Sequence, residues 1–513
     1  MAKIEFLDTT LRDGAQAVGI SFSTADKTGI LNLLDDFGMD LIEGGDPASN
    51  PKDSEFFINT SNSKLCAFGS TRHRDSDTAK DVGLNKLIEA NTKTVCIFGK
   101  ASAKQARKVL GVTPEQNLEM IRQSVRFLRE HQKRVIFDAE HFFDGYAEDK
   151  TYAFSVLLAA QDAGADTLVL CDTNGGTMPS KVYAVTSDVV HNFGSCRIGI
   201  HTHNDCGMAV ANSIMAADAG ATHVQGTFLG FGERCGNANL STIIADLALK
   251  SHVQTNCKIE RLTATARAIA EIANLTLDTS MPFVGSGAFA HKAGMHADAV
   301  IKDAESFEHI LPQSVGNSHG IVLSEVSGRS AVAKKLEHVF PSIDKCDPKT
   351  QEILDAIKNM EKQGYQFEGA DGSFILLAQR MINGVSPSFE LEYYRITAQK
   401  PSDDSNAEVC IKVNGTTTTV NESGNGPVNA LDKALRTALR HHFPSIAEVS
   451  LVDYKVRVVD STSATGALVR VLITSSDRLH TWTTVGVSTD IIEASWIALR
   501  DSLEYKLKVL GGK

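Results

Sequence analysis

The chain contains 513 residues, more than one hydrophobic core usually serves, so its length predicts roughly two to four domains. It is 42% hydrophobic and 22% charged, and a net charge of −11 without a long Lys or Arg run argues against nucleic acid or an anionic membrane as main partner. No apolar stretch approaches the roughly 18 residues of a membrane span, "MAKIEFLDTT" has no signal-peptide pattern, and the nine cysteines form no CxxC pair. We therefore expect a cytoplasmic protein that acts on small molecules.

Eight short runs rich in Val, Ile, Leu or Phe follow one another along the first part of the chain, mostly separated by helix-like segments. The runs cover residues 3–10, 40–46, 65–70, 94–100, 134–140, 167–175, 197–205 and 223–234. A helix is expected at 114–131, with Thr113 as its N-cap. Eight strand–helix units in about 250 residues predict a (β/α)8 TIM barrel. A doubly wound open sheet is the alternative, but "LDTTLRDGAQ" is not the GxGxxG loop that it would favour.

The remaining chain has a different pattern. We expect a catalytic barrel domain at 1–275, mostly helical linker subdomains at 276–387 and an α/β domain at 388–513. In this last part, strand-like segments and the amphipathic helix "GPVNALDKALRTALRHHF" are followed by a second set of the same kind, and "ALR" at 434–436 recurs at 498–500. The sequence therefore predicts a C-terminal α/β domain with an internal repeat.

Polar side chains gather at the ends of the predicted strands, which in such a barrel form the active-site face. His201 and His203 lie two residues apart, so both imidazoles can point to one side of a strand. Asp13 follows the first run and Asn237 the eighth. These four side chains predict a site for Mn²⁺, Mg²⁺ or Zn²⁺ with positions left open for substrate. The alternatives are two loop histidines and, for Asp13, a turn or N-cap carboxylate.

An arginine beside an open metal suits a bidentate ligand such as an α-keto acid. Arg12 can stabilise charge on an enolate, and Thr173 can donate a hydrogen bond to the substrate carboxylate. Glu140, at the end of the fifth run, can serve in acid–base chemistry or in positioning. For Glu140 the alternative is a salt bridge to a basic neighbour.

Three segments, "DTTLRDGAQ", "HTHNDCGMAVANS" and "GFGERCGNANL", resemble the signatures of the metal-dependent Claisen-condensing barrels, the family of isopropylmalate, homocitrate and citramalate synthases. The resemblance implies addition of acetyl-CoA to an α-keto acid, followed by thioester hydrolysis. It implies that Arg12 orients the keto acid, that Glu140 is catalytic and that Thr173 binds substrate. It implies these metal ligands: Asp13, His201, His203 and, as a further one, Asn237.

The stretch "MPFVGSGAFAHKAGMHADAV" at 281–300 is similar to a linker segment of this family that reaches over an active site, sometimes that of the partner subunit. The resemblance implies that His296 transfers a proton for acetyl-CoA with help from Asp298. The alternative is a capped helix N-terminus. Relatives often carry a tyrosine further on, but "KDAESFEHI" offers only Phe307, so that role stays unassigned.

Segments 137–146 and 364–377 look most like the branch of the family that uses pyruvate to make (R)-citramalate for isoleucine biosynthesis. The alternative in the same class uses 2-ketoisovalerate to make 2-isopropylmalate. A metal-dependent aldol lyase and a non-catalytic amino-acid sensor are the alternatives from other classes. The tail resembles the regulatory, dimer-forming domain of the family, which implies a homodimer with isoleucine as feedback ligand; a purely structural dimerisation module is its alternative.

Overall fold

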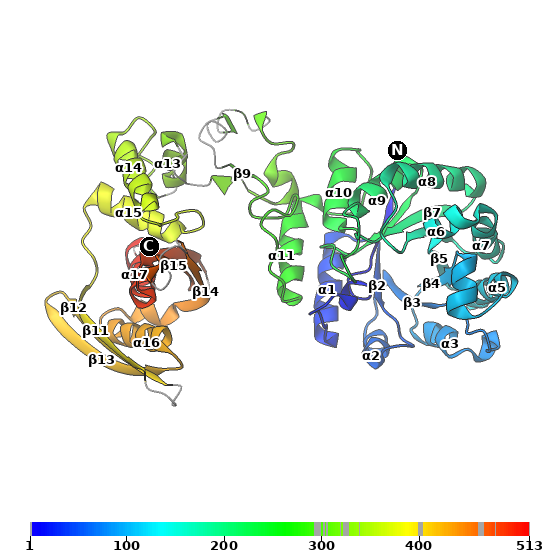
Figure 1. Ribbon diagram of the computed structural model, residues 1–513, viewed down its shortest axis with the longest axis horizontal. Coiled ribbons are helices and arrows are strands. Elements are labelled where there is room, and N and C mark those ends of the chain that lie inside the picture. Colours follow the sequence, from blue (N-terminus) through cyan, green and yellow to red (C-terminus); the bar gives the residue numbers. More distant parts are fainter. Residues whose placement is uncertain are drawn as a thin grey trace. The chain divides into compact units, whose positions relative to one another are not determined.

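A computed structural model describes residues 3–291, 299–300, 303, 306–318, 320–321, 328–337, 339–398, 404–459, 466–477 and 479–511. The chain forms two compact units, one of residues 1–289 with 310–319 and one of residues 290–309 with 320–513 (Figure 1). The expected three-way division at 275 and 387 stays a prediction. Among the described residues, no helix is long and apolar enough to cross a membrane.

The first unit contains a closed barrel of eight parallel strands, in which each strand pairs with the next and β8 pairs with β1. The strands are β1 Glu5–Asp8, β2 Leu41–Gly45, β3 Leu65–Ser70, β4 Thr94–Lys100, β5 Arg134–Glu140, β6 Thr167–Asp172, β7 Arg197–Thr202 and β8 His223–Gly226. The predicted TIM barrel is therefore confirmed. The eighth strand is much shorter than expected: it ends at Gly226, where the absence of a side chain admits the Ala238 carbonyl closely, and residues 227–234 lie outside the strand.

Helices surround these strands (Figure 1). They are α1 Thr24–Phe37, α2 Pro51–Asn59, α3 Val82–Glu89, α4 Ala103–Gln105, α5 Pro114–Glu130, α6 Phe142–Glu148, α7 Lys150–Asp162, α8 Pro179–Phe193, α9 Ala209–Asp218, α10 Leu240–Leu249 and α11 Leu262–Ile272. The start of α5 confirms the predicted cap, since the Thr113 side chain accepts from the Gln116 main-chain N–H and the Gln116 side chain accepts from that of Thr113. Ser23 and Asp26 cap α1 in the same way.

The inside of the barrel changes character along its axis. At the N-terminal end, Glu5 accepts from Arg134 Nη2 at 2.6 Å and lies 2.8 Å from Arg197 Nη1. Burial alone would raise the pKa of Glu5, but hydrogen bonds from His223 and Arg134 hold it well below its ordinary value. Inside the barrel there is also an apolar and thiol-bearing cluster, formed by Leu7, Leu41, Cys66, Cys96, Ile136, Val169 and Cys171. Burial raises the pKa of these three thiols well above their ordinary range, so they are neutral core groups.

The second unit begins with the short strand pair β9 Ala290–His291 and β10 Gly320–Ile321, followed by helices α13 Arg329–Leu336, α14 Pro348–Lys362 and α15 Asp371–Asn383. Two three-stranded antiparallel sheets follow, each succeeded by a helix: β11 Glu390–Ala398, β12 Ser405–Val413, β13 Thr416–Gly424 and α16 Pro427–Arg440, then β14 Ser450–Val458, β15 Val469–Ser476, β16 Thr481–Ser488 and α17 Ile491–Tyr505. Asn414 and Gly415 both have positive φ and form the two-residue turn between β12 and β13. The predicted internal repeat is thus present.

Candidate active site

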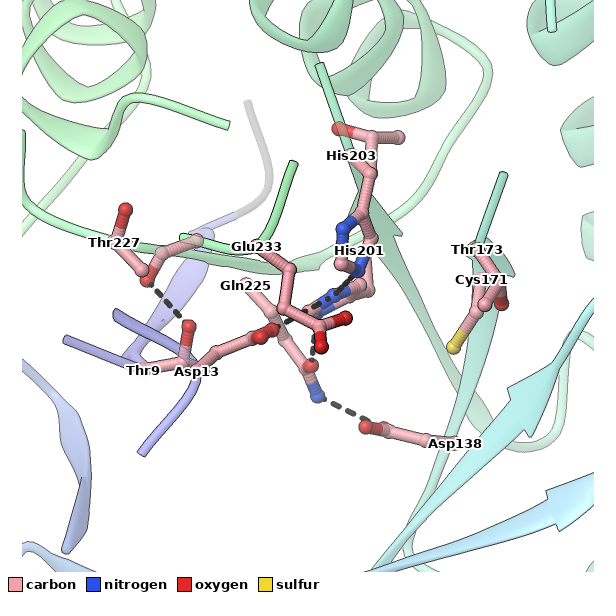
Figure 2. A network of polar contacts seen from close by, with 12 residues as sticks. Thr9, Asp13, Asp138, Cys171, Thr173, His201, His203, Gln225, Thr227 and Glu233 are labelled. Atoms are coloured by element: carbon pink, nitrogen blue, oxygen red, sulfur yellow. Dashed lines mark hydrogen bonds and ion pairs between the residues drawn. The ribbon is translucent and has the colours of Figure 1, made fainter. Parts of the chain in front are cut away.

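Three buried side chains converge at the C-terminal face of the barrel (Figure 2). Asp13 Oδ2 is 3.3 Å from His201 Nε2, which in turn is 3.2 Å from His203 Nε2. One potential ligand atom from each residue lies within 4.8 Å of the other two. The exposed fractions are only 2%, 5% and 8%, so the three groups meet in a water-poor site. Two imidazole nitrogens and a carboxylate oxygen around one point form a donor set for a divalent cation.

His203 reaches this point by a route that the sequence did not predict. The strand β7 ends at Thr202, so His203 is not its last residue but the first one beyond it. An isolated antiparallel bridge pairs His203 with Asn237, and the His203 main-chain N–H donates to the Asp172 carbonyl at 3.3 Å. The loop after β8 therefore places the second histidine.

Asn237 fits the role of a further ligand. Its side-chain oxygen and nitrogen are both buried, and neither has a hydrogen-bond partner among the described residues. Its main-chain N–H donates to Gly230 at 2.9 Å, and a side chain at Gly232 would collide with its amide nitrogen. Because buried polar atoms are nearly always paired, the buried amide oxygen of Asn237, on the segment that bridges to His203, is free to bind a cation. The residues present fit a divalent metal ion.

Charge at the centre also favours a cation. Burial alone would raise the pKa of Asp13, but Arg12 and His201 hold it well below its ordinary range, so Asp13 is a carboxylate. Burial and the neighbouring His201 lower the pKa of His203 to about 4. His203 is therefore neutral at pH 7, which is the form that binds metals.

Arg12 is held firmly beside the centre. Its Nε donates to Glu43 Oε2 at 2.6 Å, its Nη1 lies 3.5 Å from Asp13 Oδ2, and its guanidinium carbon stands 3.8 Å from the centre of the Phe68 ring. Glu43 is completely buried, and burial raises its pKa to about 7 despite the guanidinium. The side chain of Arg12 keeps 13% of its surface exposed. Arg12 is thus oriented by β2 and β3 while part of it faces a cavity.

That cavity has a volume of about 240 Å³ and a wall that is part polar and part apolar. Its lining residues are Arg12, Asp13, Gln16, Phe68, Phe98, Asp138, Glu140, Cys171, Thr173, His201, His203, Glu233 and Arg234. A small acid could therefore contact the guanidinium and the metal centre together.

Glu140 and Thr173 form the opposite part of the wall. Glu140 makes an ion pair with Lys100, its register partner on β4. The salt bridge that the sequence analysis named as the alternative for Glu140 is therefore present. The Thr173 hydroxyl accepts from the His141 main-chain N–H at 2.8 Å and retains its own hydrogen for donation. Arg234, at φ +54°, donates to the Thr173 carbonyl at 2.9 Å and bidentately to Asp205 at 2.7 and 2.9 Å. These bonds fix the loops that follow β6, β7 and β8.

The structure gathers most of the predicted site. Six residues line the cavity, namely Arg12, Asp13, Glu140, Thr173, His201 and His203, with Asn237 adjoining it. His296 and Asp298 lie outside the described residues, and all the assigned roles stay predictions. Sequence reasoning gave no role to Glu43, Lys100 or Gln225, although a charged or amide side chain inside an apolar strand was a signal for each.

Family models match nearly the whole chain. Residues 3–269 match the model described as HMGL-like, residues 283–365 match homocitrate synthase post-HMGL domain-like, and residues 368–507 match the LeuA allosteric (dimerisation) domain. The three matches follow one another along the chain, so the similarity extends from the barrel through the repeated tail.

Curated relatives match over similar lengths. The (R)-citramalate synthase of Aquifex aeolicus is 48% identical, with 98% of this chain and 98% of that protein covered. The (R)-citramalate synthase of Geobacter sulfurreducens is 45% identical over 99% and 98% of the two chains. The probable 2-isopropylmalate synthase of Methanopyrus kandleri is 32% identical over 96% of each. The chain is thus more similar to the first two relatives than to the third, over comparable lengths.

Proposed function

The chain belongs to the HMGL-like family, among the relatives named (R)-citramalate synthase, and we propose that it condenses acetyl-CoA with pyruvate to give (R)-citramalate and CoA. The observation that carries this proposal is the small cavity in which Arg12 meets Asp13, His201 and His203. An amino-acid sensor would not need these groups together. The lower identity of the 2-isopropylmalate synthase relative favours pyruvate over 2-ketoisovalerate.

In this proposal Asp13, His201, His203 and Asn237 hold Mn²⁺, Mg²⁺ or Zn²⁺, and the ion supplies Lewis acidity toward the keto group. The acetyl methyl group loses a proton, a carbon–carbon bond forms at the keto carbon, and water then hydrolyses the thioester to release the CoA thiol. The chain's own residues bind both substrates, place the charges and handle these protons.

Each residue has a part in that sequence. Arg12 stabilises negative charge on oxygen, because its guanidinium is fixed by Glu43 and faces the cavity. Thr173 donates its hydroxyl hydrogen to the keto-acid carboxylate. Glu140, paired with Lys100, serves in acid–base chemistry or in positioning. His296, assisted by Asp298, takes the methyl proton, a role proposed from the family resemblance alone.

Keto-acid preference tests the proposal directly. With acetyl-CoA saturating, release of the CoA thiol in the presence of pyruvate should exceed that in the presence of 2-ketoisovalerate by at least about tenfold in kcat/KM for the keto acid. A hydrophobic wall discriminates by roughly 1–3 kcal/mol per methylene, and packed walls resist overlap. 2-Ketoglutarate, which carries a second carboxylate, serves as a third test substrate. Equal or faster turnover of 2-ketoisovalerate would contradict the assignment to pyruvate and favour the function of a 2-isopropylmalate synthase. Absence of thiol release with every keto acid would remove the condensing function altogether.

We also propose that the repeated tail binds isoleucine and that the protein is a cytoplasmic homodimer. Two β-β-β-α halves and the match to the LeuA allosteric (dimerisation) domain support a regulatory module. An inhibitor acts only through unequal affinity for two states, so isoleucine should lower the rate and also raise the melting temperature of the full-length protein. Leucine, an isomer of equal volume, is the matched control. Inhibition by leucine but not isoleucine would reverse the assignment of the effector.

A further inference from the structure

A buried amide stands between the metal centre and the middle of the barrel (Figure 2). Gln225 lies in β8 and has no exposed surface. Its Oε1 is 2.9 Å from His201 Nδ1, and its Nε2 is 2.9 Å from Asp138 Oδ1. The same Nε2 is 3.4 Å from His223 Nε2. Every polar atom of this side chain therefore has a partner, and one of those partners is a predicted metal ligand.

The contacts continue to the N-terminal end of the barrel. His223, also fully buried, places its Nδ1 3.0 Å from Glu5 Oε2. Hydrogen bonds from His223 and from Arg134, at 2.6 Å, keep Glu5 ionised, and Arg197 lies 2.8 Å away. A row of four polar groups, Glu5, His223, Gln225 and His201, thus crosses the barrel interior from one end to the metal centre.

The positions of the hydrogens along this row follow from chemistry. An ionised carboxylate only accepts, so Glu5 requires the hydrogen of His223 on Nδ1, which leaves His223 Nε2 as an acceptor. Asp138 is an acceptor too. Gln225 must therefore turn its NH2 group toward Asp138 and His223, and its oxygen toward His201. An amide oxygen only accepts, so the hydrogen of His201 must sit on Nδ1.

We infer that Gln225 is a positioning residue that fixes the tautomer of His201, with Nδ1 protonated and the Nε2 lone pair directed at the predicted metal position. An apolar side chain of similar length would fill the same space without selecting a tautomer. Gln225 thus keeps a hydrogen on Nδ1, and no hydrogen has to move from Nε2 to Nδ1 when an ion binds at Nε2. The inference rests on the proposed metal site and extends it to a residue that contacts neither ion nor substrate.

The first test measures directly which nitrogen of His201 carries a hydrogen. Long-range ¹H–¹⁵N spectra of the metal-free, full-length protein labelled at histidine should show a hydrogen on His201 Nδ1, with the signal assigned by its loss in His201→Asn. In Gln225→Met the Nε2–H form should appear in substantial amount. A wild-type His201 without a hydrogen on Nδ1, or an unchanged Nδ1–H signal in Gln225→Met, overturns the inference.

The second test measures metal affinity without turnover. By equilibrium dialysis, the dissociation constant for Mn²⁺ should rise about 10- to 100-fold in Gln225→Met, the range usual for residues that orient a metal ligand. Gln161→Met is the matched control, because this amide lies on α7 and donates to Ser195 Oγ. Wild-type affinity in Gln225→Met overturns the inference, whereas a wild-type protein that binds no Mn²⁺ removes the proposed metal site as well.

Gln225→Glu separates tautomer selection from packing. A glutamic acid can donate its proton to Asp138 while its other oxygen still accepts from His201 Nδ1. This variant should retain the Nδ1–H signal and bind Mn²⁺ at least about tenfold more tightly than Gln225→Met, whose affinity loss is in the outer-shell range. If the Glu and Met variants lose affinity equally while the Glu variant keeps the Nδ1–H form, the tautomer does not control metal binding and the inference fails.

Discussion

Replacing Arg12 with alanine is expected to slow turnover by about 100- to 1000-fold, which is the cost of removing one fixed donor from a developing oxyanion. Arg12 cannot move away easily, because its Nε binds Glu43 at 2.6 Å and Phe68 packs against its plane. It therefore needs little reorganisation when charge develops on a bound oxygen. The measurement is kcat for thiol release with pyruvate and acetyl-CoA at saturating metal.

The fold should tolerate this change. Removal of Arg12 leaves Glu43 buried without its cation, but burial already raises the pKa of Glu43 to about 7, so the carboxyl group can take up a proton instead of staying charged. The melting temperature and the Mn²⁺ affinity of Arg12→Ala should consequently stay close to those of the wild type. These two measurements serve as the control that a loss of activity does not come from a loss of structure.

Arg12→Lys is the sharper variant. It keeps the positive charge but not the planar group that contacts Glu43, Asp13 and the Phe68 ring at once. We expect it to recover only part of the rate lost in Arg12→Ala. A lysine variant with wild-type kcat would show that charge alone matters and that the guanidinium geometry has no role.

Most of the barrel could be predicted because its strands are short apolar runs between helical segments. The runs at 65–70, 94–100 and 134–140 coincide with β3, β4 and β5. Other runs extend beyond the strands that they predict, and the largest excess is at 223–234, where β8 covers only 223–226. The Ala238 carbonyl approaches Gly226 closely at the point where β8 ends, and His203 pairs with Asn237 in the loop after β8 instead of with a strand. Such boundaries depend on contacts between segments far apart in sequence.

Dependence on contacts between distant segments also decides which site residues could be predicted from the sequence. Asp13, His201 and His203 could be named from the sequence because the two histidines stand together and a carboxylate follows the first strand. Lys100 and Gln225 could not, since their meaning lies in the register that sets Lys100 beside Glu140 on β5, and Gln225 beside His201 on β7. Asn237 was predicted as a ligand, but its bridge to His203 appears only once the loop after β8 folds back.

Loss of a metal ligand should also have a large effect, on both metal affinity and turnover. His203→Ala is expected to weaken Mn²⁺ binding by more than about 100-fold, beyond the range for residues that merely orient a ligand, and to abolish measurable turnover at micromolar metal. The Nδ1 of His203 has no hydrogen-bond partner among the described residues. Burial and the neighbouring His201 lower the pKa of His203 to about 4, so the imidazole is neutral at pH 7 and binds an ion without first releasing a proton.

The control for this variant is His191→Ala, which removes an exposed imidazole near the end of α8 and should leave both metal affinity and rate unchanged. The wild-type protein gives the complementary test: chelation followed by dialysis should stop thiol release, and added Mn²⁺ should restore it. Because Asp13 and His201 remain in His203→Ala, high Mn²⁺ concentrations should bring back part of the activity. Full turnover by the chelated wild type, or tight Mn²⁺ binding by His203→Ala, contradicts a metal centre built on the two histidines.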